Sequence, residues 1–269
     1  MMKVLPLALV GLIAATGSAF AQTADLSLPE APQTQSWSFD GPFGMYDRAA
    51  LQRGFQVYKE VCSSCHSLNR VSFHDLSYDN GGTGMFDDAQ VKAIAAAYKV
   101  PAGPNDKGET TDANGTPLTR TGIPADHFPP PFPNEQAARA NNGGALPPDQ
   151  SLLVKARDGG ADYIYSIIVG DGAKPPAGFK VTDGKYYDPY FAGRNISMPP
   201  PLRDNSVTYS DGTKATVAQE AHDVTTFLQW AAEPKLEQRH RLGFGVMAFM
   251  ILLSVLLFLS YRSVWKDAH

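Results

Sequence analysis

The segment EVCSSCHSL, residues 60–68, contains both cysteines of this 269-residue chain. Two residues separate Cys62 from Cys65, and His66 follows directly. The pattern Cys-x-x-Cys-His is the signature of covalent c-type haem attachment. In that chemistry each thiol adds to one vinyl group of the porphyrin, and the imidazole of the next residue binds the iron. We therefore predict that Cys62 and Cys65 hold one c-type haem and that His66 is an axial ligand.

Two other kinds of site use the same pair of thiols. A structural zinc site needs four ligands, usually from two such pairs, and the chain has no second pair. A thioredoxin-like redox pair has no need of the histidine that follows. Both interpretations leave His66 without a purpose, so the haem interpretation is favoured.

The N-terminus has the pattern of a secretory signal peptide. Lys3 is followed by twelve residues, 4–15, that are apolar apart from Pro6, and Ala19-Phe20-Ala21 is a small-x-small cleavage site. Twelve residues are too few to span about 30 Å of hydrocarbon, so a transmembrane helix is disfavoured here. We predict that residues 1–21 are removed and that the mature chain begins at Gln22.

The C-terminus predicts a membrane anchor, residues 239–269. Residues 242–261, LGFGVMAFMILLSVLLFLSY, contain no charge. At about 1.5 Å per residue this helix is about 30 Å long, which matches the core of a bilayer. Basic residues flank both ends, so the positive-inside rule does not decide the orientation. The signal peptide does: it predicts that residues 22–238 form a domain outside the cytoplasmic membrane and that a short tail faces the cytoplasm.

The fold class predicted for the mature chain is mainly α with long loops. The chain contains 24 glycines and 21 prolines, which favour turns and irregular segments. No convincing alternation of polar and apolar residues indicates a strand. Apolar residues recur with helical spacing in several windows, for example Leu51, Phe55 and Tyr58. The predicted helices of the exported domain are 47–61, 87–98, 134–140, 162–169 and 216–232.

Gly54 is unusual in the first of these helices. Glycine in the middle of a helix costs about 1 kcal/mol relative to alanine. Either the helix tolerates the loss, or another helix approaches so closely that no side chain fits. The position alone leaves both interpretations open.

The second axial ligand of the iron decides the function, because an open position permits ligand binding whereas a filled one leaves electron transfer. We predict Met198, in NISMPPPL, because three prolines stiffen the loop that follows it. Met45 and Met85 are less suitable, and His74 and His127 are rivals. A thioether favours ferrous iron, so ligation by histidine and methionine predicts a high reduction potential.

Four segments resemble the cytochrome c1 family, the c-type haem subunits of the cytochrome bc1 complex. They are RGFQVYKEVCSSCHSLNRVSF, NEQAARANNGGALPPDQSLLVKARDGGADYIYSII, YDPYFAGRNISMPP and DVTTFLQWAAEPKLEQRHRLG. The resemblance runs from about Trp37 to the C-terminus, and with the signal peptide it suggests a bacterial, alphaproteobacterial form. The domain would then face the periplasm, anchored in the bacterial inner membrane.

The resemblance also implies roles for single residues. The resemblance implies that His66 and Met198 are the axial ligands of the iron. It makes Arg120 the partner of a haem propionate, and Asn142 and Pro147 parts of the haem pocket. Whether the carbonyl of Pro147 or another carbonyl orients His66 stays open. It further implies that the helix containing Gly54 crosses the helix containing residues 227–230.

The function implied by the resemblance is that of a one-electron carrier, and not of an enzyme as an isolated chain. The haem would receive electrons from the Rieske iron–sulfur protein, beside cytochrome b, and pass them to a cytochrome c. Residues 22–238 contain 18 lysines and arginines against 26 aspartates and glutamates, a net charge of −8, which suits a basic cytochrome c and disfavours nucleic acid. A c-type haem subunit of a terminal oxidase is the alternative within haem proteins, and a haem enzyme with an open iron is another.

Overall fold

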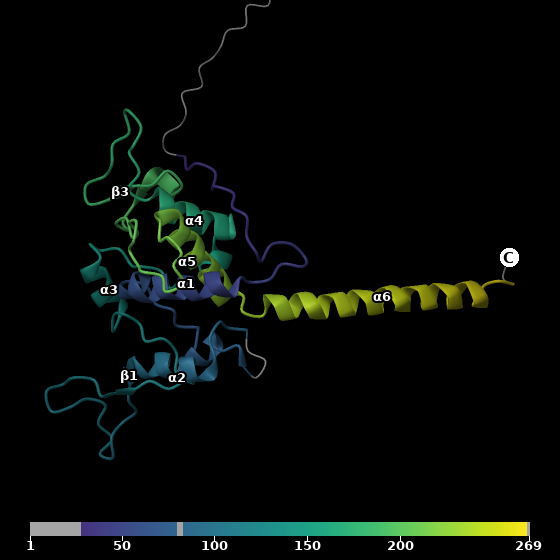
Figure 1. The fold of residues 1–269 in the computed structure, drawn as a ribbon, viewed down its shortest axis with the longest axis horizontal. Coiled ribbons are helices and arrows are strands. Elements are labelled where there is room, and N and C mark those ends of the chain that lie inside the picture. The colour runs from purple at the N-terminus through teal and green to yellow at the C-terminus, as the bar shows by residue number, and fades with distance from the viewer. Residues whose placement is uncertain (1–27, 80–82, 268–269) are drawn as a thin grey trace, which may run out of the picture.

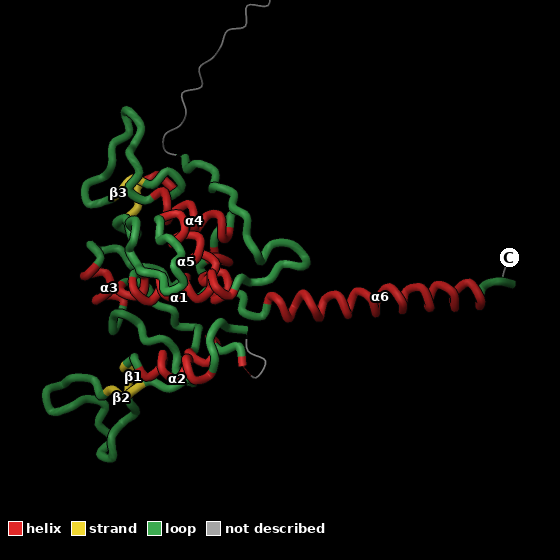
Figure 2. The backbone as a smooth tube through the Cα atoms, viewed as in Figure 1, coloured by secondary structure: helices red, strands yellow, loops and turns green. Residues whose placement is uncertain are grey.

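The computed structural model describes residues 28–79 and 83–267, and the regular secondary structure of these residues is mainly helical, with long loops between the helices, as predicted (Figures 1 and 2). The predicted signal peptide lies outside the described residues. Within the described residues, five α-helices belong to the body of the protein, and one long α-helix projects from it. The helices are α1 (Arg48–Glu60), α2 (Asp88–Ala96), α3 (Glu135–Asn141), α4 (Gly160–Gly170), α5 (Val217–Ala232) and α6 (Leu236–Val264).

Side-chain caps explain where the helices of the body begin. The carboxylate of Asp47 accepts hydrogen bonds from the first backbone N–H groups of α1, and Asn134 caps α3 in the same way. Asp87 and Gln90 form a complete capping box at the start of α2. At the start of α5 the Thr216 hydroxyl accepts a hydrogen bond from the backbone N–H of Gln219.

Helices α1 and α5 cross in close contact, and the crossing explains Gly54. A Cβ atom on Gly54 would lie 2.0 Å from the carbonyl oxygen of Asp223 and 2.8 Å from the Cβ of Phe227. One turn later the rings of Tyr58 and Phe227 pack with centroids 5.6 Å apart. The close-approach interpretation of Gly54 is therefore confirmed, and so is the crossing that the resemblance implied.

A charged contact accompanies this crossing. The carboxylate of Asp223 is fully buried and accepts hydrogen bonds from both Nε and Nη2 of Arg53, at 2.8 and 3.0 Å. The carboxylate also accepts from the side-chain amide of Gln219. A buried carboxylate needs such partners, because an unpaired one costs several kcal/mol. The crossing is therefore fixed by shape at Gly54 and by charge at Asp223.

Aromatic rings fill the core beside the crossing. Phe55 contacts Phe86, Phe128 and Phe227, with ring centroids 5.4 to 6.2 Å apart. These pairs are edge-on or tilted, the geometry that aromatic rings prefer. The core therefore joins α1, α5 and the loops around residues 86 and 128 into one body.

Two very small sheets are present that the sequence did not predict. Strands β1 (Lys99–Pro101) and β2 (Thr119–Thr121) pair antiparallel, and so do β3 (Tyr186–Tyr187) and β4 (Asn195–Ile196). Strands of two or three residues are too short to produce a recognisable alternation. The described residues also contain short 3₁₀ helices: η1 (Cys62–Ser64), η2 (Phe73–Leu76), η4 (Val154–Ala156) and η5 (Ala192–Arg194).

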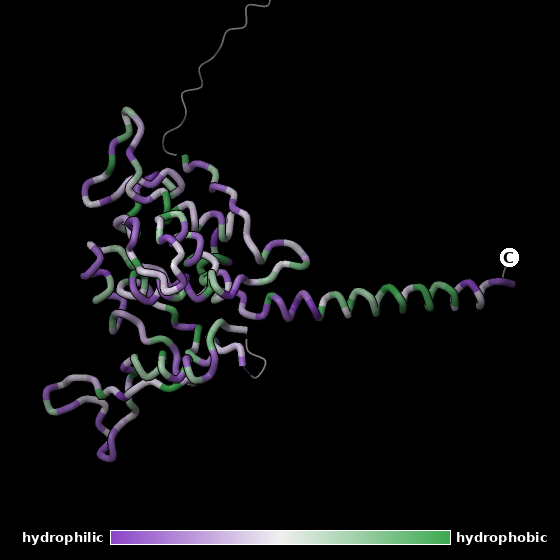
Figure 3. The backbone as a smooth tube through the Cα atoms, viewed as in Figure 1, coloured by the Kyte–Doolittle hydropathy of each residue, from purple (hydrophilic) through white to green (hydrophobic). Residues whose placement is uncertain are grey.

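Helix α6 begins two residues after Pro234, and beyond its first turns it extends away from the body (Figure 1). It begins before the predicted span, with a polar stretch, and the apolar residues 242–261 follow (Figure 3). By length and composition it can cross a membrane, and the most apolar window of it is not buried against the body. This arrangement fits a single-pass anchor.

The crossing generates the first prediction. Gly54→Ala forces α1 and α5 apart, because the added methyl would overlap the Asp223 carbonyl. We expect the free energy of unfolding to fall by about 3 kcal/mol or more, at the upper end of overpacked cores. Denaturant unfolding of the detergent-solubilised full chain measures this. Gly103→Ala is the control, since nothing lies within 4 Å of a Cβ at Gly103. Equal stability of the two variants would contradict the prediction.

Candidate haem-attachment site

The Cys-x-x-Cys-His motif lies on a tight turn at the end of α1. The helix ends at Glu60, and the backbone N–H groups of Cys65 and His66 both donate to the carbonyl of Cys62, at 3.1 and 2.9 Å. Both cysteines are free thiols, and both are half-buried. The turn brings the two thiols and the imidazole to one short piece of backbone, which the helix crossing fixes in place.

The Cys62 thiol does not have the properties of a redox-active cysteine. Burial, and to a smaller extent the neighbouring Cys65, raises the pKa of Cys62 to about 12. Reactive cysteines in Cys-x-x-Cys pairs have lowered pKa values instead, because the thiolate is the nucleophile. The surroundings of Cys62 therefore disfavour a thioredoxin-like function.

The ring of His66 is oriented by a backbone carbonyl. Its Nδ1 lies 2.8 Å from the carbonyl oxygen of Pro148. A carbonyl only accepts, so Nδ1 donates its proton and Nε2 keeps a free lone pair. Burial lowers the pKa of His66, and this effect exceeds the opposite effects of Pro148 and Asp149, so the ring is held neutral. Histidines that bind metals are oriented by such a bond in most proteins.

Asp149 fixes the position of this carbonyl. Its carboxylate accepts from the Ser67 hydroxyl at 2.7 Å, from Asn69 N–H at 2.9 Å and from Ser151 N–H at 2.9 Å. Burial raises the pKa of Asp149, but these hydrogen bonds together outweigh burial and hold the pKa below its usual value. The segment of Pro148 is thus held against the residues that follow His66. Sequence reasoning missed both residues, although the segment ALPPD was among those that carried the resemblance.

Met198 lies on a segment that is fixed at both ends. It follows β4, which pairs with β3, and it is half-buried. Two residues later the ring of Pro200 packs against Gly172, where an added Cβ would lie 2.4 Å from the Pro200 ring. The sulfur therefore sits on a restrained loop, as predicted. The role of Met198 as a ligand of the iron stays a prediction.

The rival ligands are in less suitable places. Met85 is 1% exposed and belongs to the apolar core, whereas Met45 is 62% exposed. His74 and His127 are both exposed. The choice of Met198 over these residues stays a prediction.

Arg120, Asn142 and Pro147 are found in different kinds of contact. Arg120, in β2, forms a two-armed ion pair with Asp126, at 2.6 and 2.5 Å, which lowers the pKa of Asp126 to about 2. Asn142 ends α3, and its side chain donates to the Ala138 carbonyl. Pro147 is half-buried next to the clamped Pro148. Their roles at the haem stay predictions.

Two buried carboxyl groups lie near the Met198 segment. Asp171 ends α4 and Asp188 follows β3, and Gly172 N–H donates to the Tyr187 carbonyl, which brings these two stretches together. Burial, followed by repulsion from Asp188, raises the pKa of Asp171 to about 7. Burial raises the pKa of Asp188 to about 6, against the effect of the Tyr190 and Phe191 N–H groups. Both acids therefore titrate near neutral pH.

The clamp at Asp149 generates the second prediction. Asp149→Ala leaves three donors without their acceptor, and we expect a loss of about 2 to 4 kcal/mol in the free energy of unfolding. Asp149→Asn keeps the volume but loses one acceptor, so it should lie in between. Asp106→Ala, at an exposed position, is the control and should change little. An Asp149→Ala chain as stable as this control would show that the clamp does not hold.

The acid at Asp171 generates the third prediction. Because its pKa is raised in the folded state, its contribution to stability is complete below about pH 4 and is lost as the pH rises through about 7. Asp171→Asn should therefore reduce the loss of stability between pH 5 and pH 8 by about 2 kcal/mol. Thermal or denaturant unfolding at the two pH values measures it. Asp183→Asn, at an exposed position, should leave the slope unchanged.

Comparisons with known proteins identify the family of the chain. The sequence model of the Cytochrome C1 family matches residues 37–268. The chain is 48% identical to cytochrome b/c1 of Bradyrhizobium diazoefficiens over 256 residues, covering 88% of this chain and 36% of that protein. It is 44% identical to cytochrome c1 of Rhodospirillum rubrum, covering 95% and 93%. It is 47% identical to the mitochondrial cytochrome c1 heme protein of Saccharomyces cerevisiae, covering 84% and 68%. The resemblance is confirmed, and the chain belongs to the cytochrome c1 family.

Proposed function

We propose that this chain receives single electrons from the Rieske iron–sulfur protein and passes them to a soluble or membrane-anchored cytochrome c. As a member of the cytochrome c1 family it is a c-type haem protein of electron transport in the cytochrome bc1 complex, with one membrane anchor. The route of the electrons is the proposal. The observation that carries it is the bond between His66 Nδ1 and the Pro148 carbonyl, which prepares Nε2 as a ligand.

The residues of the site fit a covalently bound haem. Cys62 and Cys65 would form the two thioethers, and His66 and Met198 would bind the iron from opposite faces. The haem supplies reversible one-electron exchange at its iron. Asn142 and Pro147 would line the pocket around it. No bond of a substrate needs to be made, so the task of the chain is to hold these ligands still.

Both axial ligands are held by the structure around them, which supports electron transfer over catalysis at an open iron. The carbonyl of Pro148 fixes the ring of His66, and Asp149 fixes that carbonyl. The segment of Met198 is restrained by β4 and by Pro200. Rigid ligands keep the coordination number the same in both oxidation states, so little rearrangement accompanies the gain or loss of an electron. Methionine ligation and burial both favour a high potential.

Arg120 would contribute positive charge at a propionate. Its guanidinium has five N–H donors, and Asp126 accepts from only two of them, one on Nη1 and one on Nη2. The pair with Asp126 therefore does not exclude a propionate as a second partner. It would instead orient the guanidinium before the haem is attached. This role rests on the resemblance and on the fixed geometry of the pair.

The location and the acceptor follow from the signal peptide and the charge. We propose that the haem domain, residues 22–238, faces the periplasm of a bacterium and that α6 anchors it in the inner membrane. The domain carries a net charge of −8, which would attract a basic cytochrome c and accelerate encounter at low salt. A haem subunit of a terminal oxidase is less well supported, because the family match extends over residues 37–268.

Substitution of Met198 tests the proposed function. Met198→Leu removes the sulfur without changing the size of the side chain. We expect the ferric iron to lose its low-spin, six-coordinate spectrum and the ferrous iron to bind carbon monoxide. The reduction potential should fall by a sizeable part of the roughly 0.8 V that axial ligands span in haem proteins. Quinol-dependent reduction of cytochrome c by membranes containing the variant complex should be lost.

The matched control for this experiment is Met85→Leu, in the apolar core. It should keep the spectrum, the potential and the reduction of cytochrome c. A Met198→Leu protein that stays six-coordinate and low-spin, and that does not bind carbon monoxide, would assign the ligand to another residue. A colourless protein after correct export would remove the haem interpretation altogether.

A further inference from the structure

We propose that the loop of residues 41–45 inserts into the lipid bilayer at the level where α6 enters it, as a second membrane contact of the haem domain. The loop, with the sequence GPFGM, contains no charge. Phe43 and Met45 are 79% and 62% exposed, whereas Gly44 and Tyr46 between and beside them are buried. The apolar side chains thus point away from the body.

The ring of Phe43 shows the depth of this loop relative to the anchor. It stacks on Phe244 with a centroid distance of 4.9 Å and an interplanar angle of 11°. Phe244 is the third residue of the uncharged span, 242–261. If α6 crosses the membrane, the loop lies at the first turn of the span. Aromatic side chains are enriched at this boundary, where the apolar ring contacts lipid.

The loop is built into the structure and cannot easily swing away. Tyr46 N–H donates to the Glu237 carboxylate of α6 at 2.8 Å, and Arg48 pairs with the same carboxylate at 2.7 Å. The Tyr46 hydroxyl donates to the Glu233 carbonyl at 3.0 Å. Gly44 has no room for a Cβ, which would lie 2.1 Å from the Phe39 carbonyl oxygen. The loop therefore has one position relative to the start of α6.

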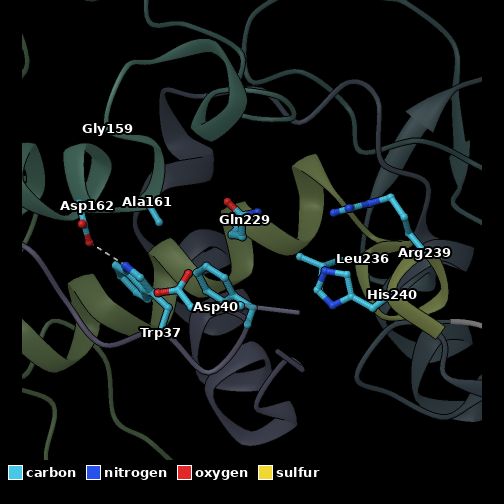
Figure 4. Close-up of a pocket in the computed structure, with 11 residues that line it drawn as sticks. Trp37, Asp40, Gly159, Ala161, Asp162, Gln229, Leu236, Arg239 and His240 are labelled. Atoms are coloured by element: carbon cyan, nitrogen blue, oxygen red, sulfur yellow. Dashed lines mark hydrogen bonds between the residues drawn. The ribbon is translucent and has the colours of Figure 1, made fainter. Parts of the chain in front are cut away.

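The segment leading into the loop is anchored as well. Trp37 stacks on Phe39 at 5.3 Å, and its Nε1 donates to Asp162 of α4 at 2.7 Å. Figure 4 shows Trp37 and Asp162 on one side of a pocket whose other side carries Arg239 and His240 of α6. The pocket, about 350 Å³, lies between the body and the first turns of the anchor. Both flanks of the loop are thus tied to the body.

Charges mark the same boundary on both chain segments. Asp40 and Asp47 flank the loop, and Arg239 and Arg241 come just before the apolar span of α6. On each segment the change from charged to apolar residues occurs within a few positions, and the stack of Phe43 on Phe244 aligns the two changes. Such an aligned boundary suits the headgroup region of a bilayer, with the apolar tips in the acyl chains. We therefore identify lipid as the occupant of this surface.

Site-directed spin labelling of the full, haem-loaded chain tests the proposal. Because the haem thioethers consume both native thiols, Phe43→Cys gives one site for a nitroxide label, and Met45→Cys gives a second that keeps the Phe43 stack. The unsubstituted protein should take up no label. If it does take up label, the prediction of covalent haem attachment is wrong, whereas the proposal for the loop is still tested by the collision rates. The chain is reconstituted in vesicles of phosphatidylethanolamine and phosphatidylglycerol, and the iron is kept reduced and diamagnetic.

The measurement is the collision rate of the nitroxide with oxygen, which concentrates in lipid, relative to a water-soluble nickel chelate. Leu252→Cys, in the middle of α6, is the lipid reference, and Ile123→Cys, exposed after β2, is the water reference. At positions 43 and 45 we expect an oxygen-to-nickel ratio at least about threefold above that of position 123, as for side chains at the acyl boundary. A ratio equal to that at 123 would overturn the proposal. Low collision rates with both reagents would also overturn it, because protein would then cover the loop. If the Phe43→Cys variant does not fold, the collision ratio of the label at position 45 tests the proposal by itself.

Discussion

The crossing of α1 and α5 is the contact on which the rest of the structure depends. At Gly54 the backbone of one helix meets the other without an intervening side chain, and the buried Asp223 is neutralised by Arg53. The two helices continue into the two functional parts of the protein. Helix α1 leads directly into Cys62, and α5 leads through three residues into α6. A shift at the crossing would therefore change the position of the haem motif and that of the anchor together.

Local patterns in the sequence predicted the elements that depend on local physics. The caps Asp47 and Asp87 act within one helical turn, so residue type and spacing were sufficient. The helical spacing of Leu51, Phe55 and Tyr58 predicted the buried face of α1. The motif at Cys62 predicted the haem because its chemistry requires three side chains at fixed spacing. In each case the determining residues are neighbours in the sequence.

The features that the sequence did not predict depend on contacts between distant segments. Pro148 orients His66 through a backbone carbonyl, and every residue has a carbonyl, so no residue type identifies it. Asp149 is unremarkable in sequence until Ser67 and Asn69 are found to donate to it across 80 residues or more. The pair of Arg120 with Asp126 is similar, since spacing in a loop does not fix geometry. For Gly54 the sequence left two interpretations, and the structure decided between them.

The junction between the domain and its anchor is stiff, and this constrains how electrons are exchanged. Glu233, in the short connection before α6, pairs with Lys155 at 3.6 Å and with Arg239, and Glu237 pairs with Arg48. Each exposed pair contributes little, but together with the buried Leu236 they join three elements at one point. These contacts hold the domain against the start of α6. If the chain exchanges electrons with two partners in turn, a domain restrained at its anchor would leave the approach to the haem to the partners.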